Sequence, residues 1–292
     1  MKIAIILPTR GHPHRCAAIL TALDHLASGE HEIEYHLIVD DDDGPHDARL
    51  PSQHEAHPRT WHHAGDPAIS HFARINEVVV GLDVDAISWF ADDVFPLTLH
   101  WDALIALGID QHKLPAFAWQ ELSDPGNVTY PVLSRKWINA VGYMLPVHFP
   151  FWFVDTWIQQ LHELAFNQPF PVVQNLQVGG RRGATRGMHE LAFWFKFFDA
   201  THVIRESEAI TLAKAFGATV EPARMLATTA KHHQITAEQL LRVPHYEEAF
   251  GADRDPPSDR YRQLKAEAEA WLEMDAKYPA FVLDPQAEAG HG

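Results

Sequence analysis

The sequence has a single cysteine and no long hydrophobic run. Cys16 has no second cysteine with which to form an internal disulfide, and its place in an apolar helical pattern favours a small buried side chain over a nucleophile. The apolar stretch near the N-terminus, residues 3–7, ends at Pro8 and is too short for a signal sequence or a membrane span. We therefore expect a cytoplasmic protein with no transmembrane segment.

Basic residues are also in short supply. The 292 residues include 23 Lys and Arg against 39 Asp and Glu, a formal net charge of −16. Such a charge repels phosphate backbones and anionic lipids, which weighs against nucleic acid and anionic membranes as partners. Despite 21 histidines, the sequence has no His-Glu-x-x-His motif, and it lacks the Gly-x-Ser-x-Gly and Walker A patterns. Zinc proteases, α/β-hydrolases and P-loop enzymes are therefore disfavoured.

Apolar residues are abundant enough for a substantial core. Hydrophobic residues make up 46% of the chain and aromatic residues 11%, which excludes general disorder. The length fits one large α/β domain, or a medium domain with an appendage. No feature of the sequence indicates an oligomeric state.

Two hydrophobic periods alternate in the first 110 residues. Residues 2–8 and 33–39 are short and aliphatic, as buried strands are, and the residues between them place an apolar face on a helix over 12–27. A second helix is expected over 69–82 and a third strand over 86–91. Later segments predict strands over 114–122 and 170–178, and helices over 134–144 (capped by Ser134) and 154–166. We expect a mostly parallel sheet flanked by helices, with ligands at the carboxyl ends of its strands.

The chain divides by pattern into three parts. Residues 1–215 hold the strands and helices of the α/β domain, and residues 216–284 form a helical extension. Residues 285–292 have the composition of a disordered tail. Within the first part, the segment 179–190 is rich in glycine and arginine and predicts a mobile loop.

Polar residues follow each of the first three predicted strands. The first strand runs into Thr9 and Arg10, the second into Asp40–Asp43, and the third into Asp92 and Asp93. Two adjacent carboxylates cost free energy unless solvent, a cation or hydrogen-bond donors compensate them. Two interpretations remain for both acidic runs: a solvated turn, or a site that holds something positive.

Five segments, taken in order, resemble a known family. They are ILPTRGHPHR, LIVDDDDG, ARINEVV, FADDVFP and FWFVDTW, within about residues 1–178. Together they resemble GT-A glycosyltransferases of the family 2 type, and more closely a group of short bacterial and phage glycosyltransferases. The resemblance implies an α/β, Rossmann-like GT-A fold with a C-terminal helical extension. It also implies a nucleotide-sugar donor, with a UDP-sugar favoured, a Mn²⁺ or Mg²⁺ ion, and a hydroxyl acceptor on a glycan, polymer, protein or modified DNA base.

The resemblance assigns the donor to the strand ends. Thr9 and Arg10 match the segment beside the base and diphosphate, and Asp40 or Asp41 matches the acid that accepts a hydrogen bond from the uracil imide or the ribose. The donor-binding residues that the resemblance implies are Pro8, Thr9, Arg10, Asp40, Asp41, Asn76 and Asp92.

The resemblance also implies a metal at the acid pair. Asp92 matches the acid near the ribose, and Asp93 matches the ligand of a divalent cation that stabilises the departing diphosphate. Relatives often add a histidine from the strand near 173–178, where this sequence offers only amides. His189 is the substitute candidate, against the alternative of a surface or core histidine.

Asp155 matches the catalytic base of inverting members, which takes the proton from the acceptor hydroxyl. It starts the helix expected over 154–166, so the alternative is a plain charge at a helix N-terminus. The neighbouring Trp152 is a candidate platform for the acceptor, although most of the nine tryptophans should be core.

Three arginines in the glycine-rich segment form a basic cluster in an acidic chain. Arg181, Arg182 and Arg186 are either a clamp for the diphosphate or a solvated run of charge.

The leading hypothesis is a metal-dependent inverting glycosyltransferase. A sugar-nucleotide nucleotidyltransferase is disfavoured, because it needs a glycine-rich loop after the first strand and LPTRGHPHR has one glycine. A degenerate GT-A domain that binds nucleotide or glycan without turnover is the other alternative, and the missing histidine keeps it open.

Overall fold

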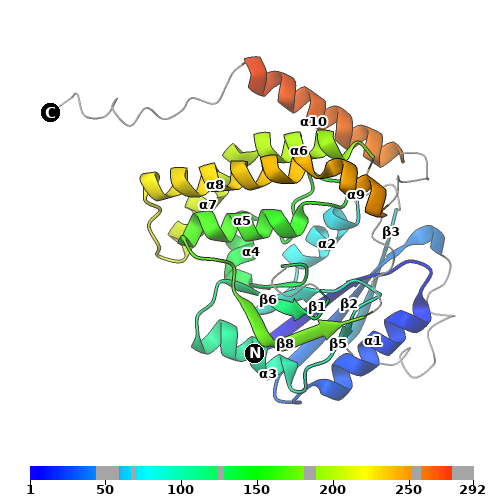
Figure 1. The fold of residues 1–292 in the computed structure, drawn as a ribbon. Coiled ribbons are helices and arrows are strands. Elements are labelled where there is room, and N and C mark those ends of the chain that lie inside the picture. Colours follow the sequence, from blue (N-terminus) through cyan, green and yellow to red (C-terminus); the bar gives the residue numbers. More distant parts are fainter. Residues whose placement is uncertain (44–58, 67–69, 124–127, 181–188, 251–257, 278–292) are drawn as a thin grey trace.

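The structure, a computed structural model, describes residues 1–43, 59–66, 70–123, 128–180, 189–250 and 258–277. An eight-stranded sheet lies at its centre, in the order β3-β2-β1-β4-β7-β6-β8-β5 (Figure 1). The strands are β1 (Lys2–Pro8), β2 (Glu32–Asp40), β3 (Thr60–Gly65), β4 (Ala86–Trp89), β5 (Phe95–Pro96), β6 (Ala116–Glu121), β7 (Pro131–Ser134) and β8 (Val172–Gly179). β1 to β4 are mutually parallel, so their carboxyl ends share one edge. The predicted, mostly parallel sheet is confirmed.

The second half of the sheet mixes directions. β7 runs antiparallel to both β4 and β6, while β6 and β8 are parallel, and the two-residue β5 closes the far edge against β8. Because β6 and β8 both run opposite to β7, which itself opposes β4, their carboxyl ends return to the edge where β1, β2 and β4 end.

Helices cover both faces of the sheet. They are α1 (Pro13–Leu26), α2 (His71–Val80), α3 (Trp101–Ala106), α4 (Arg135–Val141), α5 (Val154–Phe166), α6 (Leu191–Ala200), α7 (His202–Ala215), α8 (Pro222–Leu241), α9 (Val243–Phe250) and α10 (Asp259–Lys277), with the short turns η1 (Asp41–Asp43) and η3 (Leu107–Gln111). One core lies between the sheet and α1 and α3. Another joins the opposite face to α2, α4, α5 and α7. The expected α/β layering is therefore present.

A third cluster, largely aromatic, ties α5 to the helices that follow it. Phe149 and Phe153 precede or begin α5, and they pack with Trp157, Trp194 and side chains of α6, α9 and α10. Figure 1 shows α6, α8 and α10 as an outer layer above α5. None of the described helices is both long and apolar enough to cross a membrane.

The helix start predicted at Ser134 is confirmed. The hydroxyl of Ser134 accepts a hydrogen bond from the backbone N–H of Trp137 at 3.2 Å, as an N-cap should. α4 then ends at Val141, three residues earlier than the pattern predicted, because Gly142 takes a left-handed conformation with φ 87°. The predicted tail, residues 285–292, lies outside the described residues.

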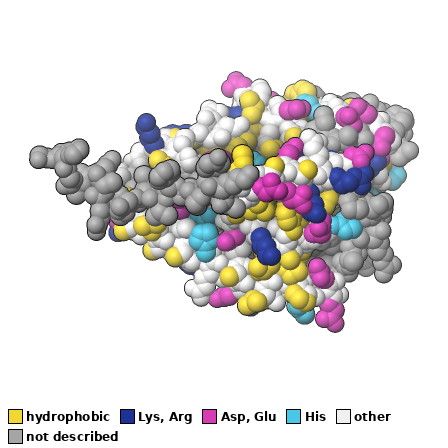
Figure 2. All heavy atoms as spheres, turned by 90° about the horizontal axis from the view of Figure 1, so that it is seen from above, with side chains coloured by type: hydrophobic (Ala, Val, Ile, Leu, Met, Phe, Trp, Pro, Cys, Tyr) yellow, Lys and Arg dark blue, Asp and Glu magenta, His cyan; other side chains and the backbone are white. Residues whose placement is uncertain are grey.

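The outer face of the helical layer carries a mixture of side chains. Figure 2 shows Lys and Arg standing among Asp, Glu and apolar groups on this face. Exposed apolar side chains include Leu226 and Leu241 of α8, the latter 83% exposed. On this face, acidic and basic side chains are therefore interspersed.

Candidate active site

The ends of β1 and β4 are joined through one carboxylate oxygen. The hydroxyl of Thr9, directly after β1, donates to Oδ2 of Asp92 at 3.0 Å. The imidazole Nδ1 of His12 lies 3.2 Å from the same oxygen. β1 and β4 are parallel neighbours, which brings their carboxyl ends together. His12 was not predicted, because only its place in a turn after a strand marks it.

The carboxylate of Asp40, at the end of β2, is shared by two arginines. Arg10 bonds to one of its oxygens and also donates from Nη2 to Oδ2 of Asp42 at 2.9 Å. These carboxylates raise the pKa of the Arg10 guanidinium above its ordinary value. Arg74 of α2 holds the other oxygen of Asp40. Both oxygens of a predicted nucleotide-binding acid are therefore bonded within the protein.

Arg74 is buried, and its hydrogen bonds connect α2 to β2 and β3. It donates to the backbone carbonyl of Val39 in β2 and, at 3.3 Å, to that of His63 in β3. A Cβ on Gly65 would lie 2.8 Å from Nε of Arg74, so the lack of a side chain at the end of β3 leaves room for the guanidinium. Arg74 lies in the segment ARINEVV, but the sequence did not mark it as a site residue. A single arginine in an apolar helix does not alter the hydrophobic pattern from which such residues are predicted.

The acidic run after β2 folds back on the turn after β1. Asp41 is exposed, and Asp43 accepts a hydrogen bond from the backbone N–H of Gly11 at 2.7 Å. Gly11 adopts φ 70°, a left-handed conformation that favours glycine. Asp42 and Asp43 therefore brace the turn at residues 10 and 11, which leaves Asp40 and Asp41 as the predicted ligand-binding acids of the run.

The backbone at Asp93 is in close contact with the end of β8. A Cβ added to Gly180 would lie 2.2 Å from the carbonyl oxygen of Asp93, so only glycine fits there without displacing the chain. Gly180 is the last residue described before a gap. The predicted basic residues Arg181, Arg182 and Arg186 lie outside the described residues.

The acid pair fits a cation that brings further ligands with it. In the described part of the chain, no group of three or more His, Cys, Asp and Glu side chains could hold a metal ion. Mg²⁺ commonly binds through one or two carboxylates together with substrate phosphates and water, and a single strand-end carboxylate can serve in such a site. Asp93 as a ligand and His189 as a second one stay predictions.

His189 lies against the outer helical layer. Its backbone carbonyl accepts a hydrogen bond from the hydroxyl of Tyr261 in α10. Its ring packs edge-on to that of Tyr261, with centroids 5.7 Å apart. The helical extension thus holds the chain at the point where the described structure resumes after residue 188.

Asn76, predicted near the nucleotide, is engaged with the backbone. Its Oδ1 accepts from the N–H groups of Met144 and Leu145, both at 3.0 Å, and its Nδ2 donates to the carbonyl of Leu145 at 2.7 Å. These three bonds fasten α2 to the segment after α4. A role for Asn76 toward the nucleotide stays a prediction.

Asp155 lies in the first turn of α5, where the sequence placed it. Its Oδ1 accepts the backbone N–H of Thr156 at 2.8 Å, and the side chain is partly exposed. The preceding Phe153 is buried with φ 73°, a strained conformation for an aromatic residue, which the surrounding aromatic cluster maintains. Trp152 packs edge-on against Tyr246 of α9, with centroids 6.3 Å apart.

Buried hydrogen bonds hold α5, the helix that carries Asp155, against α7 and the segment after α4. The indole N–H of Trp157 donates to the hydroxyl of Tyr143 at 2.8 Å, and that hydroxyl donates to Glu208 of α7 at 2.6 Å. Burial raises the pKa of Glu208 above its ordinary value. In Figure 1 the N-terminal end of α5 lies on the side of the molecule where β1 and β2 end.

Solved structures share this arrangement of strands and helices. The chain is similar to the mannosyltransferase PcManGT of Pyrobaculum calidifontis, solved with GDP-Man and Mn²⁺: TM-score 0.52, 12% identity, covering 94% of this chain and 84% of that one. It is also similar to residues 1–349 of TarS from S. aureus, solved with UDP-GlcNAc: TM-score 0.55, 12% identity, covering 94% and 92% of the two chains. The chain has the GT-A fold.

At this level of identity the likeness is one of fold. No family model and no curated protein matches the sequence. Within the GT-A fold, the contacts between Thr9 and Asp92 and between Asp40 and its two arginines are properties of this chain. Any functional conclusion therefore depends on these residues and not on the neighbours alone.

Proposed function

We propose that the protein is a glycosyltransferase that moves a sugar from a nucleotide-diphosphate donor, a UDP-sugar, to a hydroxyl group of an acceptor. The observation that carries the proposal is the meeting of Thr9, Asp92 and the doubly bonded Asp40 at the carboxyl edge of a GT-A sheet. In open α/β sheets this edge is where ligands bind. The GT-A neighbours solved with GDP-Man and UDP-GlcNAc support this class of donor.

Each strand end binds a different part of the donor in this proposal. Asp40, fixed by Arg74, offers carboxylate oxygens to the imide or hydroxyl groups of a nucleoside. Asp92 has one oxygen occupied by Thr9 and His12, and its other oxygen can accept from a ribose hydroxyl. In this arrangement the nucleoside lies across the ends of β2 and β1, and the diphosphate extends toward Asp93.

Asp93 would hold a Mn²⁺ or Mg²⁺ ion. When bound, such an ion neutralises charge that develops on the departing diphosphate. The protein's part is to present the Asp93 carboxylate at a fixed place, and the close contact of its backbone with Gly180 limits its movement.

Asp155 would act as the base of an inverting reaction. A carboxylate on the side of the sugar away from the diphosphate takes the proton from the acceptor hydroxyl as its oxygen attacks the anomeric carbon. Asp155 is held by Thr156 on a helix that the network of Trp157, Tyr143 and Glu208 fixes in place. The half-buried Trp152 beside it would carry one face of the acceptor.

Nucleotide binding provides the first test. The unfolding temperature is measured with UDP and with GDP, each with Mn²⁺ and with chelator; a ligand at 100 times its dissociation constant adds about 2.7 kcal/mol. We expect a larger UDP shift with Mn²⁺, and loss of that difference in Asp93→Ala. The control is Asp110→Ala on η3, a surface acid before the start of β6. Equal shifts with Mn²⁺ and chelator in the unmutated protein would contradict a metal-assisted donor site.

One observation favours a second candidate, a GT-A domain that binds nucleotide without turnover. β8 carries the amides Asn175 and Gln177 where the resemblance predicts a metal-binding histidine. The two candidates are separated by donor hydrolysis: an enzyme with a positioned base releases sugar from its donor slowly with water as the acceptor. A protein that binds UDP and Mn²⁺ but neither transfers nor hydrolyses the donor would be the binding domain.

A further inference from the structure

His12 is the residue at the strand ends for which the proposed roles above give no use. Its Nδ1 contacts Oδ2 of Asp92, an oxygen that also accepts from Thr9. An ionised carboxylate only accepts hydrogen bonds, so Nδ1 must carry the proton in this contact. The Nε2 atom then lies on the opposite side of the ring, and among the described residues it has no hydrogen-bond partner.

The turn that carries His12 is held on both sides. The N–H of Gly11 is bonded to Asp43 at 2.7 Å, and the carbonyl of His12 accepts from the N–H of Cys16 at 3.1 Å. Pro13 begins α1 immediately afterwards. The side chain of His12 is 48% exposed, whereas that of Asp92 is 20% exposed. The imidazole therefore stands on a fixed backbone, with its inner nitrogen on the acid and its outer nitrogen toward solvent.

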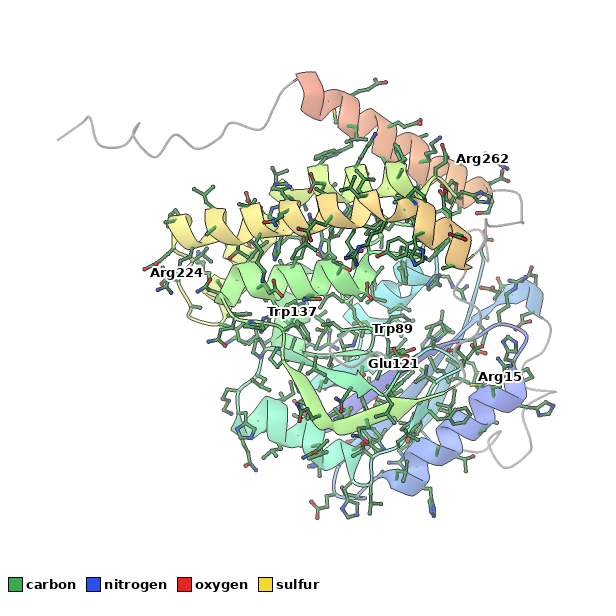
Figure 3. All side chains as sticks on the ribbon, in the orientation of Figure 1. Arg15, Trp89, Glu121, Trp137, Arg224 and Arg262 are labelled. Carbon is green, nitrogen blue, oxygen red and sulfur yellow. The ribbon has the colours of Figure 1, made fainter. Side chains whose placement is uncertain are left out.

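The arginines near the strand ends are either bound to carboxylates or directed away from the acid pair. Arg10 is bound by Asp40 and Asp42, and Arg74 is buried on Asp40. Figure 3 shows Arg15, on the first turn of α1, directed outward from the sheet. Of the described cationic or ionisable donors at these strand ends, His12 is the one that contacts the acid pair and keeps a nitrogen for a ligand.

We infer that His12 donates a hydrogen bond from Nε2 to the diphosphate of the donor, and so makes the site select nucleoside diphosphates over nucleosides. The inference rests on the proposed function. Asp92 adjoins Asp93 in sequence, so the ring that Asp92 orients stands at the turn to which the proposed function assigns the diphosphate. Asp92 thus aims the imidazole. Donation from Nε2 as well as from Nδ1 requires a proton on each nitrogen, a form of the ring that an adjacent diphosphate stabilises.

Two variants of His12 separate its two nitrogens. The amide of His12→Asn can reach the place of Nδ1 and keep the bond to Asp92, but it has nothing at the place of Nε2. The longer amide of His12→Gln can reach the place of Nε2. The matched control is His14→Ala, an exposed histidine two residues further on. Unfolding temperatures of all three verify that they fold.

Dissociation constants for uridine and UDP, with and without Mn²⁺, are measured by calorimetry. We expect His12→Asn to weaken UDP binding about 10- to 100-fold, the effect of one hydrogen bond to a charged group, and to leave uridine unchanged. His12→Gln should recover part of the loss, and His14→Ala should change neither ligand.

The outcomes separate this inference from the proposed function. Equal losses for uridine and UDP would show that His12 acts only by orienting Asp92, and unchanged UDP binding in His12→Asn would remove any role; either result overturns the inference alone. If the unmutated protein binds neither UDP nor GDP under any condition, the proposed function falls, and the inference falls with it.

Discussion

The strand-end site and the helical layer above it are stabilised in different ways. At the strand ends, partly exposed side chains from short turns pair through charge, as Arg10 does with Asp40 and Asp42. In the helical layer, buried side chains pair inside a core: Glu163 of α5 contacts His232 of α8 at 2.8 Å, and His232 contacts His202 of α7 at 3.3 Å. Exposed ion pairs contribute little to stability, whereas breaking a buried pair is costly.

This contrast separates ligand binding from stability. Substitutions at the strand ends should change nucleotide affinity with little effect on folding, and substitutions in the helical layer should do the reverse. Asp155 and Phe153 lie at the junction, because they begin the helix that belongs to both regions. The tests below attack the separation, starting with the largest expected effect.

Asp155→Asn should affect catalysis alone. Loss of a general base typically lowers the rate about 100- to 10,000-fold, while UDP affinity and the unfolding temperature should stay unchanged because the amide still fits the first turn of α5. Sugar transfer, donor hydrolysis and calorimetry provide the measurements. Asp259→Asn removes a first-turn charge from α10 and serves as the control. Retained activity with lost stability would make Asp155 a structural residue.

Trp157→Ala should affect stability first. The side chain is fully buried, and the guanidinium of Arg205 lies 4.7 Å from the centre of its ring. Truncation of a buried tryptophan costs about 3–5 kcal/mol, measured by urea unfolding. Leu241→Ala, at an 83% exposed position of α8, should change stability by less than about 0.5 kcal/mol. A stable Trp157→Ala protein would show that the aromatic cluster does not hold the layer.

Gly180→Ala should weaken metal-assisted UDP binding. The new Cβ would displace the carbonyl of Asp93, which it would approach to 2.2 Å. Displacements of about 1 Å at a reacting site can cost up to about 100-fold in rate, and we expect at least a tenfold loss of UDP affinity in Mn²⁺. Gly81→Ala, whose Cβ would make an ordinary 3.7 Å contact, is the control. Equal affinities in the two variants would mean that the chain at Asp93 yields freely.

Stability should fall as the pH is lowered, because buried histidines in the helices and in the sheet resist protonation; burial lowers the pKa of His36 in β2 and of His71 in α2 to about 4. Burial lowers the pKa of His162 to about 4 and that of His202 to about 2. Below about pH 6.5 the unfolded chain takes up protons that these folded imidazoles refuse, so each contributes a loss of about 1.4 kcal/mol per pH unit down to its folded pKa. Urea unfolding at pH 7.5, 6 and 5 measures the slope, which His162→Gln should reduce. A flat profile would contradict neutral, buried histidines.

The sequence predicted the elements that have a clear period and missed those that do not. The aliphatic runs of β1 and β2 and the apolar face of α1 were predicted from their hydrophobic pattern, and Ser134 indicated where its helix starts. β3 was missed because its residues, TWHHAG, are largely exposed at an edge and form no apolar run. β7 was missed because four residues are too few to show alternation.

The candidate site was predictable as a place but not as a set of contacts. That Thr9 and Asp92 share an edge follows from parallel strands, whereas the 3.0 Å bond between them depends on how each turn leaves its strand. Arg74 joins the site from the first turn of α2, and His12 joins it from the residue before α1. Their partners are 34 and 80 residues away in sequence, so these contacts cannot be predicted from the local sequence pattern.

The placement of Arg10 between Asp40 and Asp42 has a consequence for the kinetics of association. Each oxygen of Asp40 already accepts from an arginine, so release of one arginine would give an arriving nucleotide freer access to the carboxylate. Arg10 is the partner able to leave, because its side chain is 54% exposed while that of Arg74 is 7% exposed. Salt weakens an exposed ion pair and also screens the repulsion between an anionic nucleotide and a chain of net charge −16. Moderate ionic strength should therefore speed the arrival of the ligand, the opposite of what is seen for proteins that attract their ligands by long-range charge.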